Sequence, residues 1–93
     1  MTIALLSLEL FLPGSQSLKD KRMVLRRVKD RLGAFNVAIA EVAYQDLWQR
    51  AGLSVVTVAG SDEMADKTLS SVLNEIERVE PGLVTQSQVE FLR

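Results

Sequence analysis

The sequence predicts an α+β protein in which two helices lie on one face of a four-stranded antiparallel sheet. Apolar residues alternate with other residues at both ends of the chain, and two inner segments repeat apolar residues at helical spacing. A period of two is typical of a strand with one buried side, and a period of 3.6 is typical of an amphipathic helix. At 93 residues, the chain corresponds to a single domain over residues 1–93.

The first strand is predicted over residues 2–12. Every even-numbered position from 4 to 12 is apolar, whereas the odd-numbered side includes Ser7 and Glu9. The even side is therefore expected to face the core. A Pro-Gly pair at 13–14 ends the strand, because these residues favour turns.

A helix is predicted over residues 18–33. Ser17 suits the N-cap position, and Asp20 forms an imperfect capping box with it. Gly33 is expected to end the helix as a C-terminal glycine. The predicted buried stripe has helical spacing and consists of Leu18, Leu25, Val28 and Leu32.

The middle of the chain predicts two strands, over residues 36–43 and 53–59, because β-branched residues favour strands. Ser61 begins a second helix, which ends at a Pro-Gly pair at 81–82. Alternation over residues 83–92 predicts the last strand. This order of elements predicts a ferredoxin-like β-α-β-β-α-β sandwich with both helices on one face of the sheet.

The composition excludes several kinds of chemistry. The chain contains no cysteine and no histidine, which rules out Cys-His and Ser-His-Asp nucleophilic sites and leaves only oxygen ligands for a metal. We therefore expect no enzyme, no cofactor and no metal; the enzymatic alternative is a carboxylate pair formed by Glu9 and Glu41 on neighbouring strands. The lack of cysteine favours a reducing cytoplasm, and no apolar run is long enough to predict a membrane span.

Charge is distributed unevenly along the chain. Residues 18–31 carry seven basic and two acidic side chains, a net charge of +5, whereas the rest carries −6 and the whole chain −1. Such a helix is expected to project its basic residues outward and to follow a phosphate backbone. The predicted nucleic-acid-binding residues are Lys19, Lys21, Arg22, Arg26 and Lys29. Alternatively, these charges form a solvated helix face without a partner, which the low net charge favours.

The odd side of the first strand is expected to lie on a sheet face that no helix covers. That side includes Ile3, Leu5 and Phe11. An exposed apolar face often marks an association surface, so a homodimer formed through the sheet face or through an edge strand is predicted. The aromatic pattern with which RNA-recognition sheets stack bases is absent.

The segment after the second strand is a candidate interaction loop formed by Asp46, Trp48 and Arg50. If this loop or the sheet face carries the contact, the protein is a protein–protein adaptor or homodimeric assembly domain, and the basic helix only supplies solubility. The alternative is that Trp48 covers an edge of the core.

Three segments carry a resemblance to a known family: residues 12–22 (LPGSQSLKDKR), 35–42 (FNVAIAEV) and 45–51 (QDLWQRA). In these segments and their order, the chain resembles the YlxP-like family of small bacterial proteins, a domain of unknown function. The resemblance implies a ferredoxin-like fold, a cytoplasmic bacterial protein and no established catalytic residues. Genes of this family often lie near those of translation initiation and ribosome maturation factors, which implies RNA or a ribosomal particle as a partner. A phosphate is then expected at residues 15–19, because N–H groups at the start of a helix favour an anion.

Overall fold

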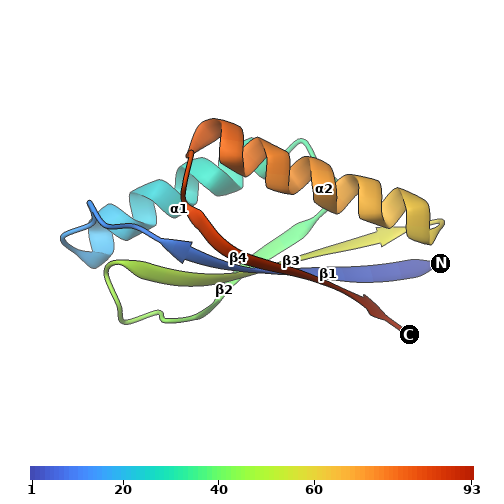
Figure 1. Cartoon of the computed structure of the whole chain (residues 1–93), viewed down its shortest axis with the longest axis horizontal. Helices are drawn as coiled ribbons and strands as arrows, with labels where there is room; N and C mark the ends of the chain where they lie inside the picture. The colour runs from blue at the N-terminus through green and yellow to red at the C-terminus, as the bar shows by residue number, and fades with distance from the viewer.

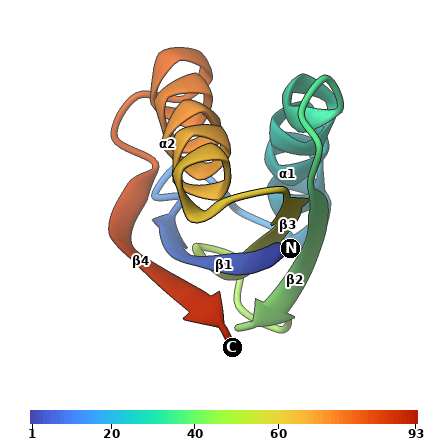
Figure 2. The ribbon, with the colours of Figure 1, turned by 90° about the vertical axis from the view of Figure 1, so that its right-hand side faces the viewer.

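The chain forms six elements: β1 (Thr2–Phe11), α1 (Leu18–Leu32), β2 (Ala38–Ala43), β3 (Arg50–Ala59), α2 (Asp62–Val79) and β4 (Val84–Leu92). The computed structural model describes all 93 residues. The strands form one antiparallel sheet in the order β2-β3-β1-β4. Both helices lie side by side on one face of this sheet, and the other face is open (Figure 1 and Figure 2). The predicted ferredoxin-like arrangement is confirmed.

The core lies between the sheet and the two helices. The even-numbered residues of β1 from Ala4 to Leu10 are at most 2% exposed, as the alternation predicts. On β3, Val55 lies opposite Leu6 and Leu53 lies opposite Leu8, and both are buried. The helices cover these strands with Leu25, Val28 and Leu32 of α1 and with Leu69, Val72 and Ile76 of α2. The odd-numbered side of β1 therefore lies on the open face.

Both helices begin at the serine caps that the sequence predicts. The Asp20 N–H donates to Ser17 Oγ at 3.0 Å, and the Met64 N–H donates to Ser61 Oγ at 3.2 Å. Each cap satisfies a backbone donor that would otherwise lack a partner, which stabilises a helix by about 1 kcal/mol. Gly33 follows α1 with φ −61°, so it ends the helix without the left-handed conformation that favours glycine there.

The connection between β2 and β3 is shorter than the sequence indicates. β3 begins at Arg50 rather than Leu53, because β1 pairs with it as far as Phe11, which lies opposite Arg50. The remaining residues 44–49 form what we call the β2–β3 loop. Tyr44, its first residue, is the one non-glycine residue with positive φ, at 61°, a conformation that such residues seldom adopt.

Candidate nucleic-acid interface

Four of the predicted nucleic-acid-binding residues share one exposed strip of α1. We call this strip the basic face; it consists of Lys19, Arg22, Arg26 and Lys29, all of which are exposed. At 3.6 residues per turn, these four positions fall within roughly 80° of the helix circumference. Arg27 lies on the side toward α2, where its Nη2 atom is 2.9 Å from Glu80 Oε1. The basic face therefore points away from α2.

The charges of the basic face are not neutralised within the protein. Of the eleven basic residues, five form an ion pair with a carboxylate: Lys21, Arg27, Arg50, Arg78 and Arg93. The other six are the four residues of the basic face, Arg31 on α1 and Lys67 on α2. Five of the six unpaired cations thus belong to one helix. The one ion pair between α1 and the region of α2 joins Arg27 to Glu80, which directly follows α2.

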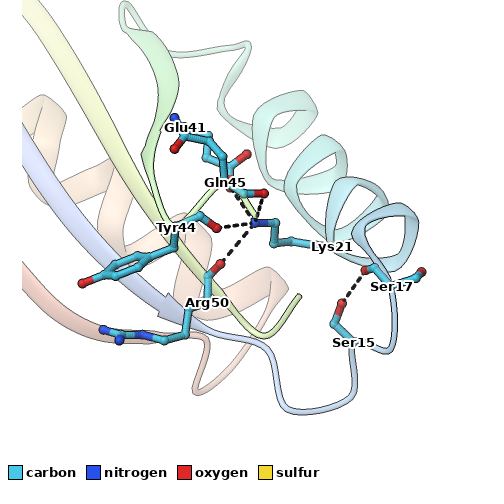
Figure 3. Close-up of polar contacts among 7 residues, drawn as sticks. All are labelled: Ser15, Ser17, Lys21, Glu41, Tyr44, Gln45 and Arg50. Carbon is cyan, nitrogen blue, oxygen red and sulfur yellow. Dashed lines mark hydrogen bonds and ion pairs between the residues drawn. The ribbon is translucent and has the colours of Figure 1, made fainter. Parts of the chain in front are cut away.

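Lys21 differs from the other basic residues of α1 because its side chain points into the protein. It is 1% exposed, and its ammonium group donates to the backbone oxygens of Tyr44 (2.9 Å), Gln45 (3.2 Å) and Arg50 (3.3 Å) (Figure 3). Its Nζ atom also lies 2.9 Å from Glu41 Oε2. Such partners replace the water that a buried ammonium loses. The prediction that Lys21 projects outward onto a nucleic acid is therefore wrong.

A signal for this burial was present in the sequence. Lys21 stands four residues before Leu25 and eleven before Leu32, so helical spacing puts it on the buried stripe. Glu41, which the sequence suggested only as a candidate catalytic group, is its counter-ion. Their pairing depends on the position of β2 relative to α1, which no local pattern specifies.

The start of α1 holds a carboxylate where a phosphate was expected. The Gln16 N–H donates to Asp20 Oδ2 at 3.0 Å, and the Asp20 N–H donates to Ser17 Oγ. Ser15 is buried, and its hydroxyl donates to the Ser17 backbone oxygen at 3.1 Å. These bonds engage the N–H groups of Gln16 and Asp20 and place a negative charge at the start of the helix, which disfavours an anion there. The phosphate position at residues 15–19 stays a prediction.

A polar cluster of Glu9, Tyr44 and Arg50 lies on the open sheet face. The Tyr44 hydroxyl donates to Glu9 Oε1 at 2.8 Å, and the Arg50 guanidinium lies 4.1 Å from the centre of the Tyr44 ring. Arg50 is also 3.6 Å from Glu9 Oε1. The hydrogen bond with the Glu9 carboxylate raises the pKa of Tyr44 above its usual value, although the positive charge of Arg50 opposes this effect.

The predicted carboxylate pair does not form. β3 places Glu9 opposite Gly52 and Glu41 opposite Leu53, and consecutive strand residues point to opposite faces. Glu9 therefore faces the open side, whereas Glu41 faces Lys21 and the helices. The expectation that the two carboxylates meet is wrong. No group of three or more His, Cys, Asp or Glu side chains is arranged to hold a metal ion.

The three predicted loop residues come together around one hollow at the end of the sheet. Asp46, Trp48 and Arg50 line a hollow of about 540 Å³ together with Phe11, Leu47 and Gln49. Trp48 is 53% exposed and Phe11 46% exposed, so the interpretation of Trp48 as a cover for the core is wrong. Sequence reasoning did not connect Phe11 with this loop, because their proximity depends on the register that places Phe11 opposite Arg50.

The fold and its surface define the chain as a ferredoxin-like α+β domain with a basic first helix. A family of proteins of unknown function, DUF503, matches residues 3–89, and the chain belongs to this family. The uncharacterised protein YlxP of Bacillus subtilis (strain 168) is 45% identical to it over 58 residues, which cover 61% of this chain and 63% of that relative. The match thus spans less than two thirds of the relative's length. The resemblance to the YlxP-like family is confirmed.

Solved structures share the fold at low sequence identity. A candidate antibiotic biosynthesis monooxygenase from Bordetella bronchiseptica is 14% identical, with a TM-score of 0.52 over 100% of this chain and 97% of that chain. A de novo designed ferredoxin-fold protein and a REP-associated tyrosine transposase bound to a REP hairpin are each 12% identical, with TM-scores of 0.51 over 99% of this chain and 83% and 56% of theirs. These likenesses show the fold alone. Neither helix of the chain is long and apolar enough to cross a membrane.

Proposed function

We propose that this protein is a non-enzymatic RNA- or ribosome-binding protein that contacts the phosphate backbone through the basic face of α1. The observation that carries the proposal is the segregation of free charge: five of the six unpaired cations lie on α1. Elsewhere the basic residues, apart from Lys67, are paired with carboxylates. Four of these five lie on one exposed strip of α1, and a strip of free cations presents what a phosphate backbone binds.

The low net charge is compatible with this proposal because binding depends on local charge. Four phosphate contacts by the basic face would release counterions, so log K should fall with log salt with a slope of about −3 for a single strand. The gene neighbourhood that the family resemblance implies points to the same class of partner. We expect the protein in the bacterial cytoplasm, where such a partner is found.

The test is binding of the purified protein to ribosomal RNA and to 30S and 50S particles at low and moderate salt. Arg22→Glu with Arg26→Glu should abolish retention, because each reversal replaces an attraction to phosphate with a repulsion. Both side chains are exposed, so the fold should survive. Lys67→Glu is the matched control for one reversal: it is exposed, unpaired and on α2. It should retain binding, whereas Arg22→Glu alone should weaken it. Unchanged retention in a folded double variant would refute the proposal.

A second candidate is a homodimeric assembly domain that associates through the open sheet face, as a protein–protein adaptor would. Ile3 lies between Val58 on β3 and Leu92 on β4, and these neighbours are 51% and 45% exposed. Sedimentation over a range of concentrations tests it. A dimer that Ile3→Asp dissociates, with no salt-sensitive RNA binding, would favour this candidate over the first.

A further inference from the structure

We infer that the hollow at Trp48 binds an unpaired base, so that the partner of the basic face is a single-stranded segment of RNA rather than a duplex. This inference rests on the proposed function and names its substrate class. It is carried by an exposed aromatic side chain on a fixed loop, by the groups around it, and by the contact of that loop with α1.

The loop that carries Trp48 is held by bonds on both sides of the tryptophan. Before it, the Lys21 ammonium binds the backbone oxygens of Tyr44 and Gln45. After it, the Gln49 backbone oxygen accepts from the Leu12 N–H at 2.9 Å, and the Gln49 side-chain amide donates to the backbone oxygens of Pro13 and Ser15. Trp48 is nevertheless 53% exposed, so about half of its surface is left free of contacts within the protein. A fixed backbone with an exposed ring is a preorganised stacking surface, because little ordering is left to be done on binding.

The groups around the hollow suit a nucleobase. Trp48 and Phe11 line the hollow and are about half exposed, and stacking on aromatic rings tolerates any base because every base has a π face. Arg50, which pairs with Glu9 and lies over the Tyr44 ring, also lines the hollow, and its side chain is about half exposed. The exposed Asp46 carboxylate lines the same hollow and would accept hydrogen bonds from the N–H groups of a base edge. The hollow has a volume of about 540 Å³ and is open rather than enclosed, which suits stacking on one face of a base.

The hollow and the start of the basic face lie at one end of the molecule. Lys21 contacts the β2–β3 loop directly, and Arg22 of the basic face is the next residue of α1. The start of α1 and the β2–β3 loop accordingly lie at the same end of the fold (Figure 1). A base inside a duplex is already stacked and cannot enter the hollow, so only an unpaired nucleotide can use both surfaces.

The single tryptophan of the chain makes the inference directly measurable. Intrinsic fluorescence is followed while three probes of equal length and charge per strand are added: a single-stranded 12-nucleotide RNA, the same RNA in a duplex, and an abasic strand. The single-stranded RNA should quench Trp48 and bind at least about fivefold tighter than the abasic strand. Equal binding of all three probes without quenching would overturn the inference.

Variants then separate stacking from a structural role. With a labelled RNA, Trp48→Ala should weaken single-stranded binding about tenfold and leave abasic binding unchanged, whereas Trp48→Phe should retain most of the affinity. Met64→Ala on α2, which removes a side chain that is 60% exposed, is the matched control and should bind as the wild type. If Trp48→Ala weakens binding of the single-stranded and the abasic probe equally, Trp48 has a structural role and the inference is overturned. It is also overturned if Trp48→Ala abolishes self-association and leaves RNA binding unchanged.

The experiments can refute the proposed function and this inference separately. If Arg22→Glu with Arg26→Glu abolishes RNA binding but Trp48→Ala changes nothing, the basic face stands and the base site is refuted. If the wild-type protein binds none of the three probes and no ribosomal particle, both are refuted.

Discussion

Replacing Lys21 with methionine removes the buried charge that joins α1 to β2 and to the β2–β3 loop. The Nζ atom lies 2.9 Å from Glu41 Oε2, a separation at which unit charges attract by about 6 kcal/mol at an effective dielectric constant of 20. Desolvation of both groups offsets part of this attraction. Methionine, however, leaves Glu41 and three backbone oxygens without their partner, and breaking a buried pair from one side costs about 3–5 kcal/mol. We therefore expect Lys21→Met to lower the free energy of unfolding by that amount.

Urea denaturation at pH 7 measures this change, with Trp48 fluorescence reporting on the loop. The double variant Lys21→Met with Glu41→Met should recover at least about 1 kcal/mol, because no unpaired carboxylate is left in the interior. It also supplies a folded reference if the single variant unfolds. A loss below about 1 kcal/mol in the single variant, the value typical of an exposed pair, would refute the reasoning that Lys21 is buried and structural.

Two further predictions concern stability. A Cβ at Gly52 would lie 2.8 Å from the Ala43 Cβ, so Gly52→Ala should cost about 1–3 kcal/mol in urea denaturation, and Ala43→Gly in the same chain should restore part of it; a neutral Gly52→Ala would contradict the close approach. Hydrogen bonds from Arg93 and Thr2 lower the pKa of Asp62 from its ordinary value of 3.8, and two from Arg78 lower the pKa of Glu75 from 4.5. Because the folded pKa values are the lower ones, this stabilisation is complete above about pH 4.5 and is lost as the pH falls through them. With Asp62→Asn and Glu75→Gln, the urea midpoint should therefore fall less steeply as the pH is lowered from 5 to 2. An unchanged pH dependence would show that the two pairs contribute nothing.

The fold was accessible from the sequence because each element has its own local signal. The alternation of β1 placed its even side in the core, and Ser17 and Ser61 marked both helix starts, as observed. The start of β3 was less accessible. Arg50 to Gly52 pair with β1 because Glu9, Leu10 and Phe11 lie opposite them, and that constraint comes from a strand far away in the chain.

The residues of the site could be predicted from the sequence only where the helix period decides which side chains are exposed. The outward position of Arg22, Arg26 and Lys29 follows from the helix period. The inward position of Lys21 follows from it too, but the charge of Lys21 led to the prediction that it is exposed. The partners of Lys21 and the association of Phe11 with Trp48 depend on contacts between distant segments, which local patterns do not carry.

The position of a charge, rather than the net charge, decides whether this chain can bind a polyanion. Arg22→Glu and Lys67→Glu change the net charge of −1 by the same amount, one on the basic face and one on α2. If RNA responded to the net charge, both variants would weaken binding equally. At physiological ionic strength, however, charges are screened over about 8 Å, so the carboxylates of α2 act little on a phosphate that lies on the outer strip of α1. A larger effect of Arg22→Glu would therefore assign binding to the basic face, and equal effects would leave α1 with no special role.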